Sequence, residues 1–184
     1  MPKEKIRKIF IFIIAAYCII AAGFNFLAGD QLKYKESSGN IVMLEADYVT
    51  DEVNKETSVS QTFLNTVERI ETIELVFTKH YRDGSGIVTI ELYARNKLLI
   101  KKEMNIRQIP EQRVVNLIPE EPIENMKNRK LTLKISSNAE IGNGVAIMMN
   151  RGNAPDGSFV KINDESIEGT LCFSIVGAEY IRIS

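Results

Sequence analysis

The sequence holds few residues of the types that perform catalysis. His80 is the single histidine of the 184-residue chain, and it lies between Lys79 and Tyr81 at the end of an alternating apolar run. Any Ser–His–Asp site would need this imidazole as its base, and no serine nearby has the setting of a nucleophile elbow. Multi-histidine metal sites are excluded. We expect His80 to be an exposed or edge histidine that precedes a turn.

The cysteines and carboxylates also favour a non-catalytic protein. Cys18 lies in an apolar N-terminal stretch, whereas Cys172 alternates with strand-like neighbours. We expect no disulfide between them, and we expect Cys172 to be a small core residue. Most acidic residues alternate with apolar ones, which indicates the solvated faces of strands. A glycosidase would need paired carboxylates in a cleft with aromatic walls, and the chain has no tryptophan.

Turn-like segments hold the residues best suited to binding. Sugars are recognised by aromatic stacking and by hydrogen bonds from polar loops, and the segment Met149–Gly157 combines an arginine with amides and glycines. An ordinary Asn/Gly/Pro turn is the alternative. The candidate ligand-binding residues are Tyr81, Arg82, Asn150, Arg151 and Asn153, with Tyr93, Arg95 and Asn96 as a further group.

A structural calcium ion is a second idea for the same turns. Asp83, Asn153 and Asp156 could offer loop oxygens, but no stretch has the spacing of an EF-hand. Turn formation accounts for both Asp-Gly pairs more simply. We therefore predict no cofactor and no metal site, with structural calcium as the alternative.

The uncharged stretch Ile9–Ala28 precedes the rest of the chain and determines where that part of the chain lies. As a helix it would be about 30 Å long, the hydrocarbon thickness of a bilayer. Four basic residues and one acidic residue precede it, which predicts a cytoplasmic N-terminus. We therefore predict a cytoplasmic tail and transmembrane helix over residues 1–28, with an extracytoplasmic domain beyond. The alternative is a cleaved signal peptide.

The remaining chain is divided into a linker and a β-domain. Residues 29–56 are predicted to be a polar stalk with a break at Ser37–Asn40, although Ile41–Val49 could form a first strand or a docking turn. From residue 57 to residue 184 the apolar period is two, with Gly, Asn, Asp and Pro between the runs, which is typical of an antiparallel sandwich. The runs are 57–63, 71–81, 87–95, 98–106, 113–118, 130–136, 144–150, 169–177 and 179–184.

Charge limits the partners of this domain. The chain has 23 basic and 24 acidic residues, and the part after residue 28 carries a net charge of −4 because four of the basic residues lie before the apolar stretch. It has no basic run, so nucleic acid is excluded as a partner. The lipid bilayer is the expected partner of the N-terminal stretch.

Three segments resemble the galactose-binding-like jelly-roll domains of bacterial membrane-anchored surface proteins. They are the entry strand at Ser58–Phe63, the long run at Glu68–Arg95 and the strand at Arg129–Ala139. The resemblance implies an all-β jelly-roll β-sandwich after one N-terminal transmembrane helix, and it raises the expectation of carbohydrate binding at the cell envelope. The motifs describe the scaffold and not a site. The alternative is an accessory protein that docks onto a membrane partner, such as a surface-polysaccharide assembly enzyme.

Overall fold

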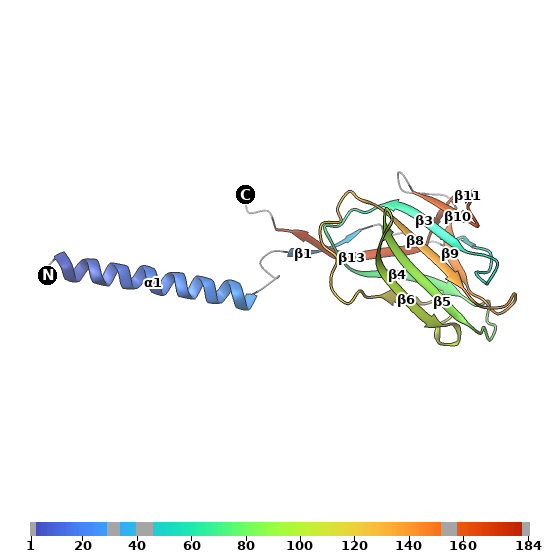
Figure 1. Cartoon of the computed structure of the whole chain (residues 1–184), viewed down its shortest axis with the longest axis horizontal. Helices are drawn as coiled ribbons and strands as arrows, with labels where there is room; N and C mark the ends of the chain where they lie inside the picture. The colour runs from blue at the N-terminus through green and yellow to red at the C-terminus, as the bar shows by residue number, and fades with distance from the viewer. Residues whose placement is uncertain (1–2, 29–33, 40–45, 152–157, 182–184) are drawn as a thin grey trace. The chain divides into compact units, whose positions relative to one another are not determined.

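The computed structural model describes residues 3–28, 34–39, 46–151 and 158–181 (Figure 1). It divides into two compact units, one of which contains the N-terminal helix and the other residues Glu36–Glu179. The helix, α1, spans Lys3–Ala28. It is long and apolar enough over Lys3–Phe24 to cross a membrane, and its side chains there are not buried against protein. Such a helix at this position is a membrane span or a signal sequence.

The second unit is a β-sandwich of two antiparallel sheets, as the alternating pattern predicts. Within the described residues, a seven-stranded sheet and a six-stranded sheet are formed. The first sheet has the order β1 (Tyr34–Gly39), β13 (Phe173–Tyr180), β4 (Arg69–Thr78), β9 (Ala146–Asn150) and β12 (Thr170–Leu171), with β7 (Val114–Leu117) on β4 and β2 (Tyr48–Val49) on β9. The second has the order β11 (Glu165–Ile167), β10 (Phe159–Ile162), β3 (Val59–Leu64), β8 (Lys130–Ser137), β5 (Ile87–Ala94) and β6 (Lys97–Asn105).

Consecutive strands mostly cross from one sheet to the other, as in a jelly roll. β3, β4 and β5 alternate between the sheets, and so do β7, β8, β9 and β10. A short 3-10 helix at Ile106–Gln108 follows β6. Because the chain crosses repeatedly between the two sheets, residues that are distant in sequence lie close together and can line one cavity.

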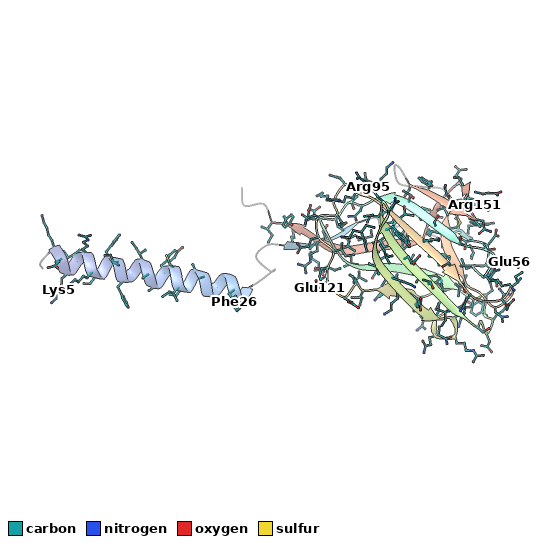
Figure 2. The ribbon with its side chains drawn as sticks, in the orientation of Figure 1. Lys5, Phe26, Glu56, Arg95, Glu121 and Arg151 are labelled. Atoms are coloured by element: carbon teal, nitrogen blue, oxygen red, sulfur yellow. The ribbon has the colours of Figure 1, made fainter. Side chains whose placement is uncertain are left out.

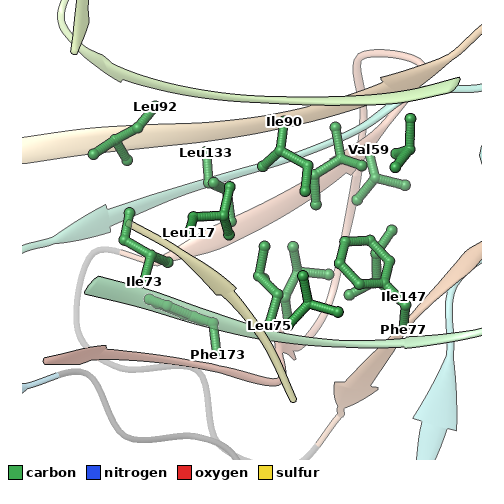
Figure 3. Packing of buried hydrophobic residues seen from close by; sticks show 14 of the residues in the cluster. Val59, Ile73, Leu75, Phe77, Ile90, Leu92, Leu117, Leu133, Ile147 and Phe173 are labelled. Atoms are coloured by element: carbon green, nitrogen blue, oxygen red, sulfur yellow. The ribbon is translucent and has the colours of Figure 1, made fainter. Parts of the chain in front are cut away.

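The core lies between the sheets (Figure 3), and in β3, β5 and β8 buried residues alternate with outward ones. The rings of Phe63 and Phe173 pack with centroids 4.8 Å apart. One buried polar residue joins the sheets: Gln61 of β3 donates to Thr170 Oγ1 at 2.6 Å and accepts from the Leu171 N–H at 2.7 Å. Both amide groups are therefore satisfied, which a buried glutamine requires.

Part of the segment expected to be a stalk belongs to the sandwich. Ser37, Ser38 and Gly39, where we expected a break, lie in β1, and only Tyr48–Val49 of the apolar run forms a described strand, β2. Val53 is fully buried and forms an antiparallel bridge with Val145. Residues 40–45 lie outside the described part. Since strand pairing occurs in both described parts of this segment, they belong to the sandwich and do not only lead to it.

Two further differences concern the C-terminal strands. The run at 169–177 is divided at Cys172 by a bend, so that β12 pairs with β9 and β13 pairs with β4. The run expected at 179–184 is in its described part the end of β13. The hairpin of β10 and β11 was not predicted, and it forms one wall of the site described next.

Candidate functional site

Arg151 lies directly after β9 and stacks on a tyrosine of the neighbouring strand. Its guanidinium carbon is 3.4 Å from the centroid of the Tyr48 ring, and Tyr48 pairs in register with Met149. The Arg151 backbone N–H donates to Asp47 Oδ1 at 3.0 Å. Sheet pairing and this hydrogen bond thus fix the place where the chain leaves β9 (Arg151 is labelled in Figure 2).

The stacked pair lines a cavity of about 370 Å³. One wall comes from β2 and the end of β9, and the other comes from the β10–β11 hairpin of the second sheet. The floor is apolar, because Met149 is fully buried. The lining residues are Tyr48, Asp51, Met149, Arg151, Ile162, Ile167 and Glu168.

Three charged side chains at this cavity make no hydrogen bond or ion pair in the described part of the chain: Asp51, Arg151 and Glu168, all of them exposed. The contact of Arg151 with the Tyr48 ring leaves its donors available. A guanidinium offers a fork of donors, and two carboxylates offer paired acceptors. Together with an apolar floor and one aromatic ring, this set can bind a small polyhydroxylated ligand.

The structure brings only some of the predicted loop residues together near the Arg151 cavity. Asn150 is the last residue of β9 and pairs with Thr170, so it lies next to Arg151 at the cavity edge. Asn153 lies outside the described residues. Tyr81 and Arg82 make no contact with Arg151 among the described residues.

Arg82 is used by the fold. Its guanidinium donates to Glu52 Oε2 at 3.1 Å, to the Gly142 carbonyl at 3.2 Å and to the Lys79 carbonyl at 3.3 Å. Glu52 Oε1 in turn accepts the N–H groups of Gly142 and Gly144, both at 2.8 Å. Burial would raise the pKa of Glu52, but these two N–H groups and the guanidinium outweigh it, so the pKa of Glu52 is lowered.

Tyr81 is presented on a turn that Glu111 holds. His80 and Tyr81 both have positive φ, 53° and 59°, and Tyr81 is 82% exposed. Glu111 accepts from the Thr78 hydroxyl and from the Lys79 N–H. Burial would raise the pKa of Glu111, but these hydrogen bonds outweigh it and lower that pKa. The expectation of an exposed histidine before a turn is confirmed.

Cys172 is buried, as predicted, but it lies on the outer side of the seven-stranded sheet and not in the cluster between the sheets. It is fully buried at the bend between β12 and β13, and its N–H donates to the Met148 carbonyl at 2.8 Å. Burial, with a smaller contribution from Asp47, raises the pKa of its thiol to about 11. The thiol is therefore protonated at neutral pH and unreactive.

The metal candidates are not brought together in the described residues. Asp83 is exposed, and Asn153 and Asp156 lie outside the described part. Among the residues described, no group of three His, Cys, Asp or Glu side chains has a geometry that could hold a metal ion.

A second hollow lies on the outer face of the seven-stranded sheet. Val76 and Val114 pair in register there, with Met148 and Cys172 beside them, and the hollow has a volume of about 580 Å³. Its remaining lining comes from Ala46, Gln112 and Arg113. Both hollows are mostly apolar, and this one is more so than the Arg151 cavity.

Sequence reasoning missed Tyr48, Asp51 and Glu168 as site residues. A signal for one wall was present in the sequence: Asn163 and Asp164 separate two short apolar runs, and both have positive φ in the structure. Asn and Asp with positive φ are typical of two-residue hairpin turns. The pairing of Tyr48 with β9, by contrast, joins positions about 100 residues apart and leaves no local mark.

Comparisons with known proteins add little to this description. No protein-family model matches the chain, and the search of curated proteins found no significant match. A solved structure described as "Structure of infectious bursal disease virus Gt strain" is similar over 82% of this chain and 46% of its own, with 15% identity and a TM-score of 0.32. The chain thus spans about half the length of that protein.

Proposed function

We propose that this protein is a non-catalytic carbohydrate-binding module of the cell envelope and that it binds sugar in the Arg151 cavity. The observation that carries the proposal is the convergence on one partly apolar cavity of three charges, Asp51, Arg151 and Glu168, which make no hydrogen bond or ion pair with the described residues. The resemblance to galactose-binding-like jelly rolls supports the same class of ligand. No step of this function needs a base, a nucleophile or a metal ion.

The chemistry of the cavity fits one or two sugar rings. Its volume of about 370 Å³ lies near the lower end of the range for small-molecule sites. Carboxylates accept pairs of sugar hydroxyls, and the guanidinium donates to a hydroxyl or to the ring oxygen. Ile162 and Ile167, both half-buried, offer an apolar surface to the C–H face of the ring.

The N-terminal helix supplies the proposed location. Lys3, Lys5, Arg7 and Lys8 precede the apolar part of α1, and positive residues of this kind are retained on the cytoplasmic side. The domain after α1 would then lie outside the cytoplasmic membrane, where surface glycans are found.

A glycan-array screen tests the proposal. The full chain in mild detergent is applied with and without Ca²⁺, together with Arg151→Gln and a matched control, Arg107→Gln, in which an exposed arginine of the 3-10 helix is changed. We expect specific binding that falls about tenfold or more in Arg151→Gln and is unchanged in Arg107→Gln. A blank array from folded protein would contradict the proposal.

A membrane-protein partner is the second candidate function, and the apolar hollow on the outer face of the seven-stranded sheet favours it. Val76, Val114 and Met148 line this hollow together, and Val114 is 45% exposed. Contiguous apolar surface of this kind marks protein contact sites. Crosslinking in the native membrane tests this candidate. Val114→Asp should abolish a specific crosslinked product, whereas Asn116→Asp on the same outer face of β7 should leave it unchanged.

A further inference from the structure

The outer face of the six-stranded sheet has an ordered set of side chains that the cavity does not use. Because Val59, Phe63, Leu131 and Leu133 point into the core, the residues between them point to the outside. The strand order and register place these outward residues in rows across β6, β5, β8, β3 and β10 (Figure 1).

The first row holds three lysines and one glutamate. Lys134 of β8 lies between Glu91 of β5 and Ser60 of β3, and Ser60 lies opposite Lys161 of β10, while Glu91 also lies opposite Lys101 of β6. Two strand spacings separate the Cα atoms of Lys134 and Lys161, a distance of about 10 Å. This spacing is comparable to the repeat of two rings in an extended pyranose chain.

The neighbouring row combines hydroxyls with aromatic rings. Tyr93, Thr132, Thr62 and Phe159 follow one another in register across four strands. The two threonine hydroxyls are hydrogen-bonded at 3.0 Å, and Phe159 is 40% exposed. Aromatic rings and threonine hydroxyls in one line suit the C–H faces and hydroxyls of a sugar chain.

Three lysines of this face make no ion pair in the described part of the chain: Lys130, Lys134 and Lys161. The Lys161 ammonium lies 5.8 Å from the centroid of the Phe159 ring. Two acidic residues share the face: Glu103 pairs with Lys101 at 2.9 Å, and Glu91 lies in register between Lys101 and Lys134. Lysines still outnumber glutamates on this face of a domain of net negative charge, and this local excess of positive charge can attract an anion.

We infer that this face binds an extended anionic glycan, a sugar chain that bears carboxylate or phosphate groups. Lys134 and Lys161 contact successive anionic groups, Ser60, Thr62 and Thr132 bond to hydroxyls between them, and Phe159 stacks on one ring. This inference does not rest on the Arg151 cavity, whose side chains lie elsewhere.

Binding of polygalacturonate to the full chain in nanodiscs of zwitterionic lipid tests the inference. The variant is Lys134→Gln/Lys161→Gln. Its matched control is Lys97→Gln/Lys102→Gln, which removes the same charge from β6. These two lysines pair in register with the inward residues Ala94 and Ile90, so they do not belong to the outer face. Fully methyl-esterified polygalacturonate serves as the neutral chain, and poly-glutamate serves as an anionic chain without sugar.

We expect wild type and the control pair to bind polygalacturonate equally, and the variant to bind about tenfold more weakly or less. Phe159→Ala should also weaken binding, and the neutral ester should not bind. The inference would be overturned by equal loss of polygalacturonate binding in the two lysine pairs, by equal binding of poly-glutamate, or by no binding of polygalacturonate to wild type. Binding only to vesicles of anionic lipid would also overturn it. Failure here is distinguishable from failure of the cavity proposal, because the cavity is tested on the glycan array through Arg151→Gln and this face is tested on polygalacturonate through Lys134→Gln/Lys161→Gln.

Discussion

Arg82 and Arg151 lie in loops of similar composition, yet the structure uses them in opposite ways. Arg82 donates to one carboxylate and two carbonyls, and it joins three segments of the chain. Within the described residues, Arg151 is held by its backbone N–H and by stacking on Tyr48, and its side chain faces a cavity. An arginine in a Gly/Asn-rich turn is thus a structural residue when an acid reaches it, and a candidate for binding when none does.

The adjacent acids show the same contrast. Glu52 accepts two backbone N–H groups and a guanidinium, whereas the carboxylate of Asp51 makes no hydrogen bond or ion pair among the described residues. Two adjacent residues of one segment therefore have different roles: the charge of Glu52 stabilises the fold, whereas the charge of Asp51 is available to a ligand. Four predictions test this contrast.

The largest expected effect is on stability. Glu52→Ala leaves two backbone N–H groups and Arg82 without their acceptor, so it should reduce the free energy of unfolding by about 2–4 kcal/mol. Asp51→Ala should change it by less than about 0.5 kcal/mol. Urea unfolding of the full chain in mild detergent measures both. Equal effects would contradict the contrast.

Acid should weaken the Arg82 region first. The pKa values of Glu52 and Glu111 are lowered from 4.5 in the folded protein, so their contribution to stability is complete above the unfolded value and is lost as pH falls through the folded values. Wild-type stability should therefore fall as pH drops below 4.5. The fall should be shallower in Glu52→Gln, which lacks one of the two groups. Urea midpoints between about pH 5 and pH 3 measure this; parallel curves would contradict it.

The two arginines should differ when each is removed. Arg82→Ala should cost about 1–2 kcal/mol of unfolding free energy, because it breaks a partly buried ion pair and two hydrogen bonds. Arg151→Ala should cost less than about 1 kcal/mol, the value of one exposed cation–π contact. Thermal unfolding of the two variants under one condition gives the comparison. A larger loss for Arg151→Ala would assign it a structural role.

The smallest effect is the coupling of Arg151 with Tyr48. A double-mutant cycle of Arg151→Ala and Tyr48→Leu should give a coupling of about 0.5–1 kcal/mol in stability. Tyr48→Phe keeps the ring and should retain the coupling. A coupling near zero would mean that the stacked arrangement does not persist in solution.

The architecture was predictable from local signals. Alternation at Val59, Gln61 and Phe63, and again at Ile73, Leu75 and Phe77, identifies inward faces without any knowledge of the partner strands. The uncharged N-terminal stretch likewise predicts its own helix. These features depend on near neighbours in the chain, which the sequence displays directly.

The site was only partly predictable, because its walls come from distant segments. Arg151 could be named from its turn, but its pairing with Tyr48 and its place opposite Ile162 and Glu168 depend on how two sheets meet. Likewise, the partner of Arg82 is Glu52, which is 30 residues away. Ser37–Gly39 was interpreted as a break because its composition is turn-like, yet it forms β1 beside β13. There, sheet pairing overrides local propensity.

Hydrogen–deuterium exchange with the sugar found on the array tests the central claim most directly. Bound ligand should protect the backbone around Tyr48–Asp51 and Ile162–Glu168, the two walls of the Arg151 cavity. Exchange at Lys79–Gly84 and Glu140–Gly144, the segments held by Arg82 and Glu52, should be unchanged. Protection of the Arg82 segments with unchanged exchange at the cavity walls would contradict the account.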